Sequence, residues 1–147
     1  MIDLLTIDMS SEDHYRSKTN MKSMNVDFFN SMIQNGKHHQ YMTNTLQVNT
    51  GLGGFSDIAN IAGISKTDWS WSGLLIDIDN DSWKDIIITN GIKKDVLNND
   101  YIKYINNLNE NISEEEFFNV AKKAPSLPLS NYAYRNTGNL KFENVSE

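Results

Sequence analysis

An acidic loop at residues 77–85 holds the side chains whose type and spacing are best suited to chemistry. Carboxylates occupy positions 1, 3, 5 and 9 of this loop, and they repel one another unless a cation lies among them. Calcium suits the loop because it is a hard ion that accepts about six to eight oxygen ligands in flexible geometry. The alternative is a solvated acidic turn without a metal. The predicted calcium ligands are the side chains of Asp77, Asp79, Asp81 and Asp85 and the backbone carbonyl of Trp83.

The residues on either side of the loop argue against an EF-hand. That motif needs two flanking helices and a Glu at the twelfth loop position, which is Ile88 here. Residues 73–76 and 86–89 are short, bulky and largely apolar segments, the second of them rich in β-branched side chains, which is typical of buried strands. The sequence therefore predicts a β-hairpin whose connection carries the metal.

No group of residues has the spacing of an acid–base pair or of a nucleophile with its base. Glu114, Glu115 and Glu116 are consecutive, so on a helix they fan out around the axis. Glycoside cleavage instead needs two carboxylates that face each other across a cleft. The Ser and His residues lack a nucleophile-elbow context. We therefore expect no intrinsic catalysis.

The composition argues against several kinds of protein and of site. The 147-residue chain has a net charge of −6, so it lacks the basic surface that nucleic-acid binding needs. It also contains no Cys. Disulfides and thiolate metal sites are excluded as well. No apolar run reaches the roughly 18 residues of a membrane-spanning helix, and the first residues lack the pattern of a signal peptide.

The chain contains an internal repeat. Residues 3–8 resemble residues 85–90 at an offset of 82, which makes Asp3 the counterpart of Asp85. The sequence Asn-Thr-Gly occurs at 49–51 and again at 136–138, and each occurrence predicts a turn between two strands. We expect the chain to begin inside one structural unit and to end soon after another has begun. At an offset of 87, Asn44, Asn49, Thr50, Gly51 and Phe55 recur as Asn131, Asn136, Thr137, Gly138 and Phe142.

One complete unit is predicted at residues 44–90, with strands at 44–49, 54–58, 70–77 and 85–90. Four short strands per repeat are typical of a propeller blade. The predicted fold is mainly β with helical insertions, a fragment of a β-propeller with one full four-stranded blade and two partial blades. Its predicted parts are the end of one blade (1–16), a helical insertion (17–43), the full blade (44–90), a second helical insertion (91–128) and the start of the next blade (129–147).

Both insertions show helical periodicity. The spacing of Ser113 and Glu116 predicts a capping box, and Pro125 follows the expected last turn. We expect the first apolar stripe to pack against a sheet. The stripes are Met21, Met24, Phe28 and Met32, which precede Gly36, and Tyr101, Ile105, Leu108 and Ile112.

Two Trp residues precede the acidic loop. Trp69 and Trp71 lie two residues apart, so in a strand both point to the same face. Exposed rings could stack on a sugar, whereas buried rings would fill the space between two sheets. We expect burial, because large aromatic rings are mostly buried.

The order of these motifs resembles a known repeat family. An Asn-x-Gly turn with Phe four residues after its Gly is followed by Ala-Gly-Ile at 62–64 and Trp-Ser-Trp at 69–71. The acidic loop and an apolar strand come next. This order resembles FG-GAP/VCBS repeats, the integrin-alpha-like seven-bladed β-propellers. It is most similar to the bacterial cartilage-acidic-protein-like branch, which often carries an ASPIC/UnbV domain.

The resemblance implies that the loop binds calcium in a structural role. The family usually has Gly at the sixth loop position, where this chain has Ser82, and a non-Gly residue with positive φ there costs about 1 kcal/mol. The resemblance also implies a module on the outer-membrane surface, in the periplasm or outside the cell. It would bind protein or carbohydrate in adhesion, together with the rest of the propeller. The alternative is the propeller part of a secreted polysaccharide-degrading enzyme.

Overall fold

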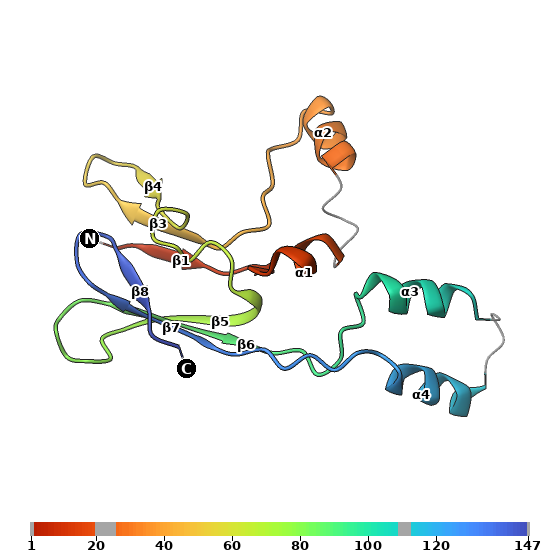
Figure 1. Cartoon of the computed structure of the whole chain (residues 1–147). Coiled ribbons are helices and arrows are strands. Elements are labelled where there is room, and N and C mark those ends of the chain that lie inside the picture. The colour runs from red at the N-terminus through yellow and green to blue at the C-terminus, as the bar shows by residue number, and fades with distance from the viewer. Residues whose placement is uncertain (1, 20–25, 109–112, 147) are drawn as a thin grey trace. The chain divides into compact units, whose positions relative to one another are not determined.

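The computed structural model describes residues 2–19, 26–108 and 113–146, and the chain forms two compact units (Figure 1). All described strands belong to unit 1 and all described helices to unit 2. The prediction of a mainly β chain with helical insertions is confirmed. Unit 1 comprises Met1–Asp13, Met42–Gly91 and Leu129–Glu147, and unit 2 comprises His14–Tyr41 and Ile92–Pro128.

Unit 1 contains two antiparallel sheets. The three-stranded sheet has the order β1 (Leu4–Thr6), β3 (Thr45–Asn49), β4 (Phe55–Asp57). The five-stranded sheet has the order β2 (Met9–Ser10), β5 (Asp68–Ile76), β6 (Asp85–Asn90), β7 (Tyr132–Asn136), β8 (Phe142–Asn144). The four strands predicted between residues 44 and 90 are all present as β3 to β6.

The sequence repeat is also a structural repeat. β1, β3 and β4 correspond to β6, β7 and β8, and the residue pairs of the two sets match at the offsets of 82 and 87. The hairpin turns match too, because Gly51 and Gly138 have φ values of 74° and 79°. Two examples of matched pairs are Leu5–Leu46 with Ile87–Ala133, and Val48–Ser56 with Arg135–Glu143.

The sheets group the strands differently from the unit predicted at residues 44–90. β3 and β4 pair with β1, whereas β5 and β6 pair with each other and β6 with β7. The four-stranded meander is therefore β5-β6-β7-β8, and residues 92–128 are inserted between β6 and β7. The other insertion occupies the matching place between β1 and β3. Strand pairing here joins segments far apart in the sequence, so the run of consecutive strands did not reveal it.

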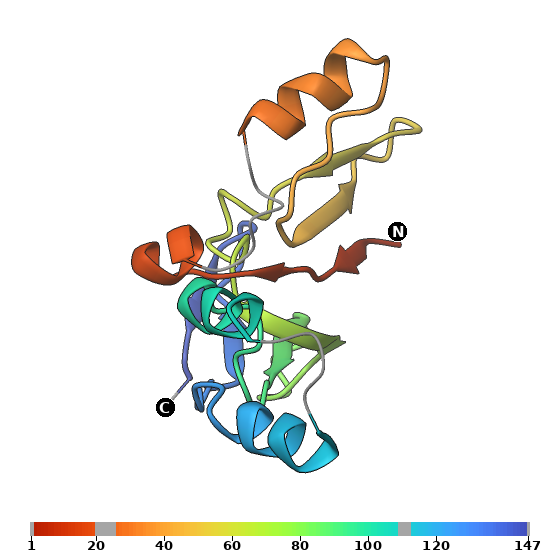
Figure 2. The same ribbon diagram turned by 90° about the vertical axis from the view of Figure 1, so that its right-hand side faces the viewer.

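The two sheets of unit 1 lie face to face across one core (Figure 1), and the turned view of Figure 2 allows the same strands to be followed by colour. Ile86 and Ile88 of β6 are fully buried, and each contributes roughly 1.5–3 kcal/mol through burial. Gly73 allows β1 to approach β5, because a Cβ there would lie 3.0 Å from Ile7 Cγ2 and 3.1 Å from Leu5 Cδ2. The buried cluster consists of Leu46, Ile58, Ala59, Ala62, Ile64, Ile86, Ile88 and Tyr134.

The expected burial of both Trp residues is wrong for Trp71. Trp69 is half-buried, whereas Trp71 is 64% exposed and its Nε1 donates to the carbonyl of Gly91. The register of β5 shifts between Ser70 and Ser72. This irregularity breaks the simple alternation from which a common face was expected.

The first segment of unit 2 contains α1 (His14–Thr19) and α2 (Val26–Gln34). Gly36 ends α2 as predicted: its φ is 74°, its N–H donates to Ile33 O, and the N–H of Lys37 donates to Met32 O. These bonds form a Schellman motif. Phe28 is exposed, and packing of the apolar stripe against a sheet remains a prediction. Met21 and Met24 lie outside the described residues.

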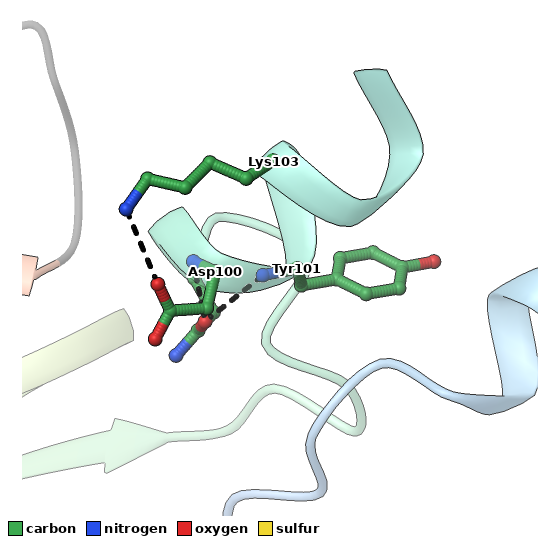
Figure 3. Close-up of polar contacts among 4 residues, drawn as sticks. Asp100, Tyr101 and Lys103 are labelled. Carbon is green, nitrogen blue, oxygen red and sulfur yellow. Dashed lines mark hydrogen bonds and ion pairs between the residues drawn. The ribbon is translucent and has the colours of Figure 1, made fainter. Parts of the chain in front are cut away.

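The second segment contains α3 (Asn99–Asn106) and α4 (Glu114–Lys122). Asn98 caps α3 by accepting from the N–H groups of Asp100 and Tyr101, and Lys103 pairs with Asp100 (Figure 3). The predicted capping box of Ser113 and Glu116 is confirmed in both directions. Ile112 lies outside the described residues. Within the described part of the chain, the helices are too short and too polar to span a bilayer.

Candidate metal centre

The acidic loop connects β5 to β6 as a hairpin. The antiparallel pairing of Ile76 with Asp85 closes the loop, and strands lie on both sides of it. This confirms the predicted hairpin and excludes the helix-loop-helix of an EF-hand. Asn80 and Ser82 have φ values of 61° and 75°. The sixth loop position therefore has the positive φ for which Gly is the favoured residue.

Three carboxylates of the loop converge. Asp77, Asp79 and Asp85 each contribute one oxygen to a group in which these atoms all lie within 4.8 Å of one another. Asp77 is half-buried, Asp79 is exposed and Asp85 is buried. Three negative charges at such distances form a local concentration of charge that favours a cation. The carboxylates thus form a cluster that is open to solvent at Asp79 and closed at Asp85.

Asp85 is the structural anchor of the cluster. Its residue is 1% exposed, and each carboxylate oxygen accepts a backbone N–H at 2.8 Å. One donor is Ile78 within the loop and the other is Asn136 at the end of β7. Asp85 therefore links the loop to the neighbouring strand, which restricts where its oxygens can point.

Asp77 shapes the first half of the loop. One of its oxygens accepts the N–H of Asp81 at 3.1 Å, and the other accepts the N–H of Ser82 at 3.0 Å. Each carboxylate oxygen has more than one lone pair. Asp77 can therefore hold the turn through one lone pair per oxygen and retain the other for a cation.

Two predicted ligands lie outside the converging group. Asp81 is not among the three carboxylates, and its Oδ1 accepts the N–H of Trp83 at 2.7 Å. The side chain of Trp83 is exposed. Ligation by the side chain of Asp81 and by the carbonyl of Trp83 remains a prediction. The structure brings together Asp77, Asp79 and Asp85 of the predicted set.

Arg135 is a neighbouring charge that the sequence did not reveal. The pKa of its guanidinium is raised, first by its hydrogen bond to Glu143, then by the charge of Glu143 and by the charges of Asp79 and Asp85. Its position in β7, opposite Glu143 in β8, follows from strand pairing. No local motif marks Arg135, because only the fold brings β7 beside the acidic loop.

The predicted equivalence of Asp3 and Asp85 is visible in their hydrogen bonds. Asp3 Oδ1 accepts the N–H of Asn49 at 2.9 Å, just as Asp85 Oδ1 accepts that of Asn136. Asn49 and Asn136 are themselves repeat partners. The carboxylate just before β1 and the one that begins β6 therefore have the same role: each fixes the end of the next strand in its sheet.

The donor set of the cluster fits a hard divalent cation. All three groups are carboxylates, which suit calcium, magnesium and manganese, whereas the converging group includes no His or thiolate to favour softer metals. Three carboxylates supply fewer oxygens than calcium usually takes, so water or further loop oxygens would complete its coordination.

In comparisons of the chain with protein-family models, with curated proteins and with solved structures, none matches it.

Proposed function

We propose that this chain is a calcium-binding repeat module of an extracytoplasmic β-propeller that binds protein or carbohydrate ligands. The observation that carries the proposal is the convergence of Asp77, Asp79 and Asp85 in a hairpin between two strands of a repeated sheet. The order of the sequence motifs, which resembles FG-GAP/VCBS repeats, supports the same conclusion.

The architecture of unit 1 supports the propeller part of the proposal. Two sheets with the same three-strand register pack face to face, as consecutive blades do in a propeller. The unit that corresponds to one blade is β5-β6-β7-β8, and β1-β3-β4 supplies three strands of the preceding blade. The helical segments are insertions between the second and third strands of each blade.

The proposed role of the metal is structural. A bound cation would neutralise the three carboxylates. Hydrogen bonds of the same carboxylates hold the loop in place. Asp77 accepts the N–H groups of Asp81 and Ser82, and Asp85 connects the loop to Asn136. Binding would thus stabilise the hairpin and the adjoining end of β7. The exposed position of Asp79 fits a site of modest affinity, with a dissociation constant of about 10⁻⁴–10⁻³ M, the range of extracellular modules.

Calorimetric titration of the 147-residue chain with calcium tests this proposal. We expect one calcium ion per chain at about this affinity, and loss of the binding heat in Asp79→Ala. Lys103→Gln, which changes one charge in α3, is the control and should bind like the original chain. Absence of calcium binding, or equal binding by Asp79→Ala, would contradict the proposal.

A further inference from the structure

The face of the five-stranded sheet that points away from the core is apolar. Leu74 pairs with Ile87, and Ile87 pairs with Ala133, so these side chains share one face. Leu74 is 51% exposed. Ile76 extends the same face because it lies two residues from Leu74, and Val145 extends it because it lies opposite Ala133, one position beyond the pair Tyr134–Asn144. Both side chains are exposed. We call this surface, made of Leu74, Ile76, Ile87, Ala133 and Val145, the Leu74 face.

The internal repeat indicates what covers such a face. The counterparts of Ile87, Ala133 and Val145 lie in the three-stranded sheet or directly after its last strand, and they pack into the core against the five-stranded sheet. The backbone geometry is repeated as well: Val145 N–H donates to Ala133 O at 2.8 Å, and the counterpart bond is 2.9 Å long. The Leu74 face is therefore a second version of a surface that already packs against a sheet. The counterparts are Leu5, Leu46 and Ile58, respectively.

A second surface lies on the opposite side of the two-sheet stack of unit 1. The five-stranded sheet faces the core with Ile86, Ile88, Tyr132, Tyr134 and Phe142. Their counterparts point away from the core on the three-stranded sheet, where Phe55 is 57% exposed and Leu4 is also exposed. The remaining counterparts are uncharged. We call this surface, made of Leu4, Thr6, Thr45, Gln47 and Phe55, the Phe55 face.

We propose that the Leu74 face of one copy of this chain binds the Phe55 face of a second copy. The five-stranded sheet of one copy would pack against the three-stranded sheet of the other, as these two sheets pack within one chain. The interface would contain the repeat counterparts of the side chains that form the core. The two partners present different surfaces, so the interface is heterologous and each added copy leaves one Leu74 face and one Phe55 face free. The ion pair of Arg135 and Glu143 lies beside the Leu74 face and would form part of its polar rim.

Analytical ultracentrifugation of the 147-residue chain tests this head-to-tail association. We expect the mean mass to rise over about a hundredfold range of protein concentration, because association follows mass action. Leu74→Glu and Phe55→Glu should each weaken association at least about tenfold, since either change places a charge in an apolar interface. Leu52→Glu is the matched control: Leu52 is 93% exposed at the tip of the β3–β4 hairpin, and this variant should associate like the original chain.

A mixing experiment identifies the head-to-tail geometry. Leu74→Glu retains an intact Phe55 face and Phe55→Glu retains an intact Leu74 face, so an equimolar mixture should form dimers that grow no further. Val145→Glu and Leu4→Glu provide a second pair if either first variant loses its circular-dichroism spectrum. Calcium and a chelator should give the same association, which separates this result from the metal-binding proposal.

Three outcomes would overturn the inference: a chain that stays monomeric over the whole range, a mixture that stays monomeric while the original chain associates, or a Phe55→Glu variant that still dimerises alone. The last outcome would indicate that two Leu74 faces bind each other.

Discussion

At the scale of single residues, Asp79 and Asp85 have different roles in the same cluster. Asp85 is buried and accepts two backbone N–H groups, whereas Asp79 is exposed. Asp79→Ala should remove calcium-dependent stabilisation and leave the calcium-free protein unchanged or slightly more stable, because it relieves repulsion. Asp85→Ala should lower the free energy of unfolding by about 2–4 kcal/mol even without calcium, because it leaves two N–H groups without their acceptor.

Urea unfolding of both variants in the presence of a chelator measures this difference. Asp3→Ala is an informative comparison, since Asp3 accepts one backbone N–H and is exposed. It should lower the free energy of unfolding less than Asp85→Ala does. Equal destabilisation by Asp79→Ala and Asp85→Ala would contradict the assignment of Asp85 as a structural anchor and of Asp79 as a metal ligand without that role.

Ser82 is a residue at which the conformation of the loop disfavours the side chain that is present. Its φ of 75° lies in the left-handed region, where a non-Gly residue costs roughly 1 kcal/mol. Ser82→Gly should ease this turn and tighten calcium binding by a few-fold, although greater freedom of the unfolded chain offsets part of the gain in stability. Calorimetric titration measures the change, and weaker binding by Ser82→Gly would contradict this account of the loop.

The sequence predicted most of the candidate site, because its ligands follow one another in a single loop. The hairpin and the cluster of Asp77, Asp79 and Asp85 follow from local spacing and strand-forming flanks, whereas the positive φ at Ser82 was implied by the resemblance to the repeat family. Arg135 and the donor Asn136 N–H were not recognised as parts of the site. They reach it from β7, about fifty residues later in the sequence, and only sheet formation brings them there.

At the scale of elements, the two repeated hairpins share a position of positive φ that is Gly in one copy and Leu in the other. Gly53, in the β3–β4 turn, has a φ of 83°, and its repeat counterpart Leu140, in the β7–β8 turn, has a φ of 61°. Leu140→Gly should therefore raise the free energy of unfolding by about 0.5–1 kcal/mol, after allowance for the freer unfolded chain.

The reciprocal change is its control. A Cβ at Gly53 would meet no atom within 4 Å, so Gly53→Leu chiefly strains the left-handed backbone conformation and should lower the free energy of unfolding by about 1 kcal/mol. Thermal unfolding of both variants provides the measurement. A destabilising Leu140→Gly would indicate that the partly exposed Leu140 contributes through packing instead.

The elements themselves were largely predictable, whereas their partners were not. Strand-forming runs, the Asn-Thr-Gly turns, Gly36 and the capping box at Ser113 are local signals, and the structure contains each of them. The sequence did not indicate that β1 pairs with β3 across residues 7–44, or β6 with β7 across residues 91–131. Such pairing depends on the apolar faces that two distant strands can bury together.

At the scale of the whole molecule, the two copies of the three-stranded arrangement explain both the core and the exposed apolar faces of unit 1. The core forms where one copy packs against the other, and the repeat counterparts of its residues lie on the outward faces. The Leu74 face is apolar, whereas the Phe55 face combines apolar Leu4 and Phe55 with three uncharged polar residues. The exposed apolar surface is the basis of the proposed association between copies of the chain. The candidate metal centre lies at one end of the β5–β6 hairpin, and Asp85 connects it with β7 of the same sheet.

Thermal unfolding of the 147-residue chain with calcium and with a chelator is the most direct test of the central claim, that the acidic hairpin binds calcium structurally. At a calcium concentration about twenty times the dissociation constant, binding should add about 1.8 kcal/mol to the free energy of unfolding. The melting temperature should then rise by roughly 4–7 °C, and Asp79→Ala should abolish the rise. Equal melting temperatures in calcium and in chelator would contradict the claim.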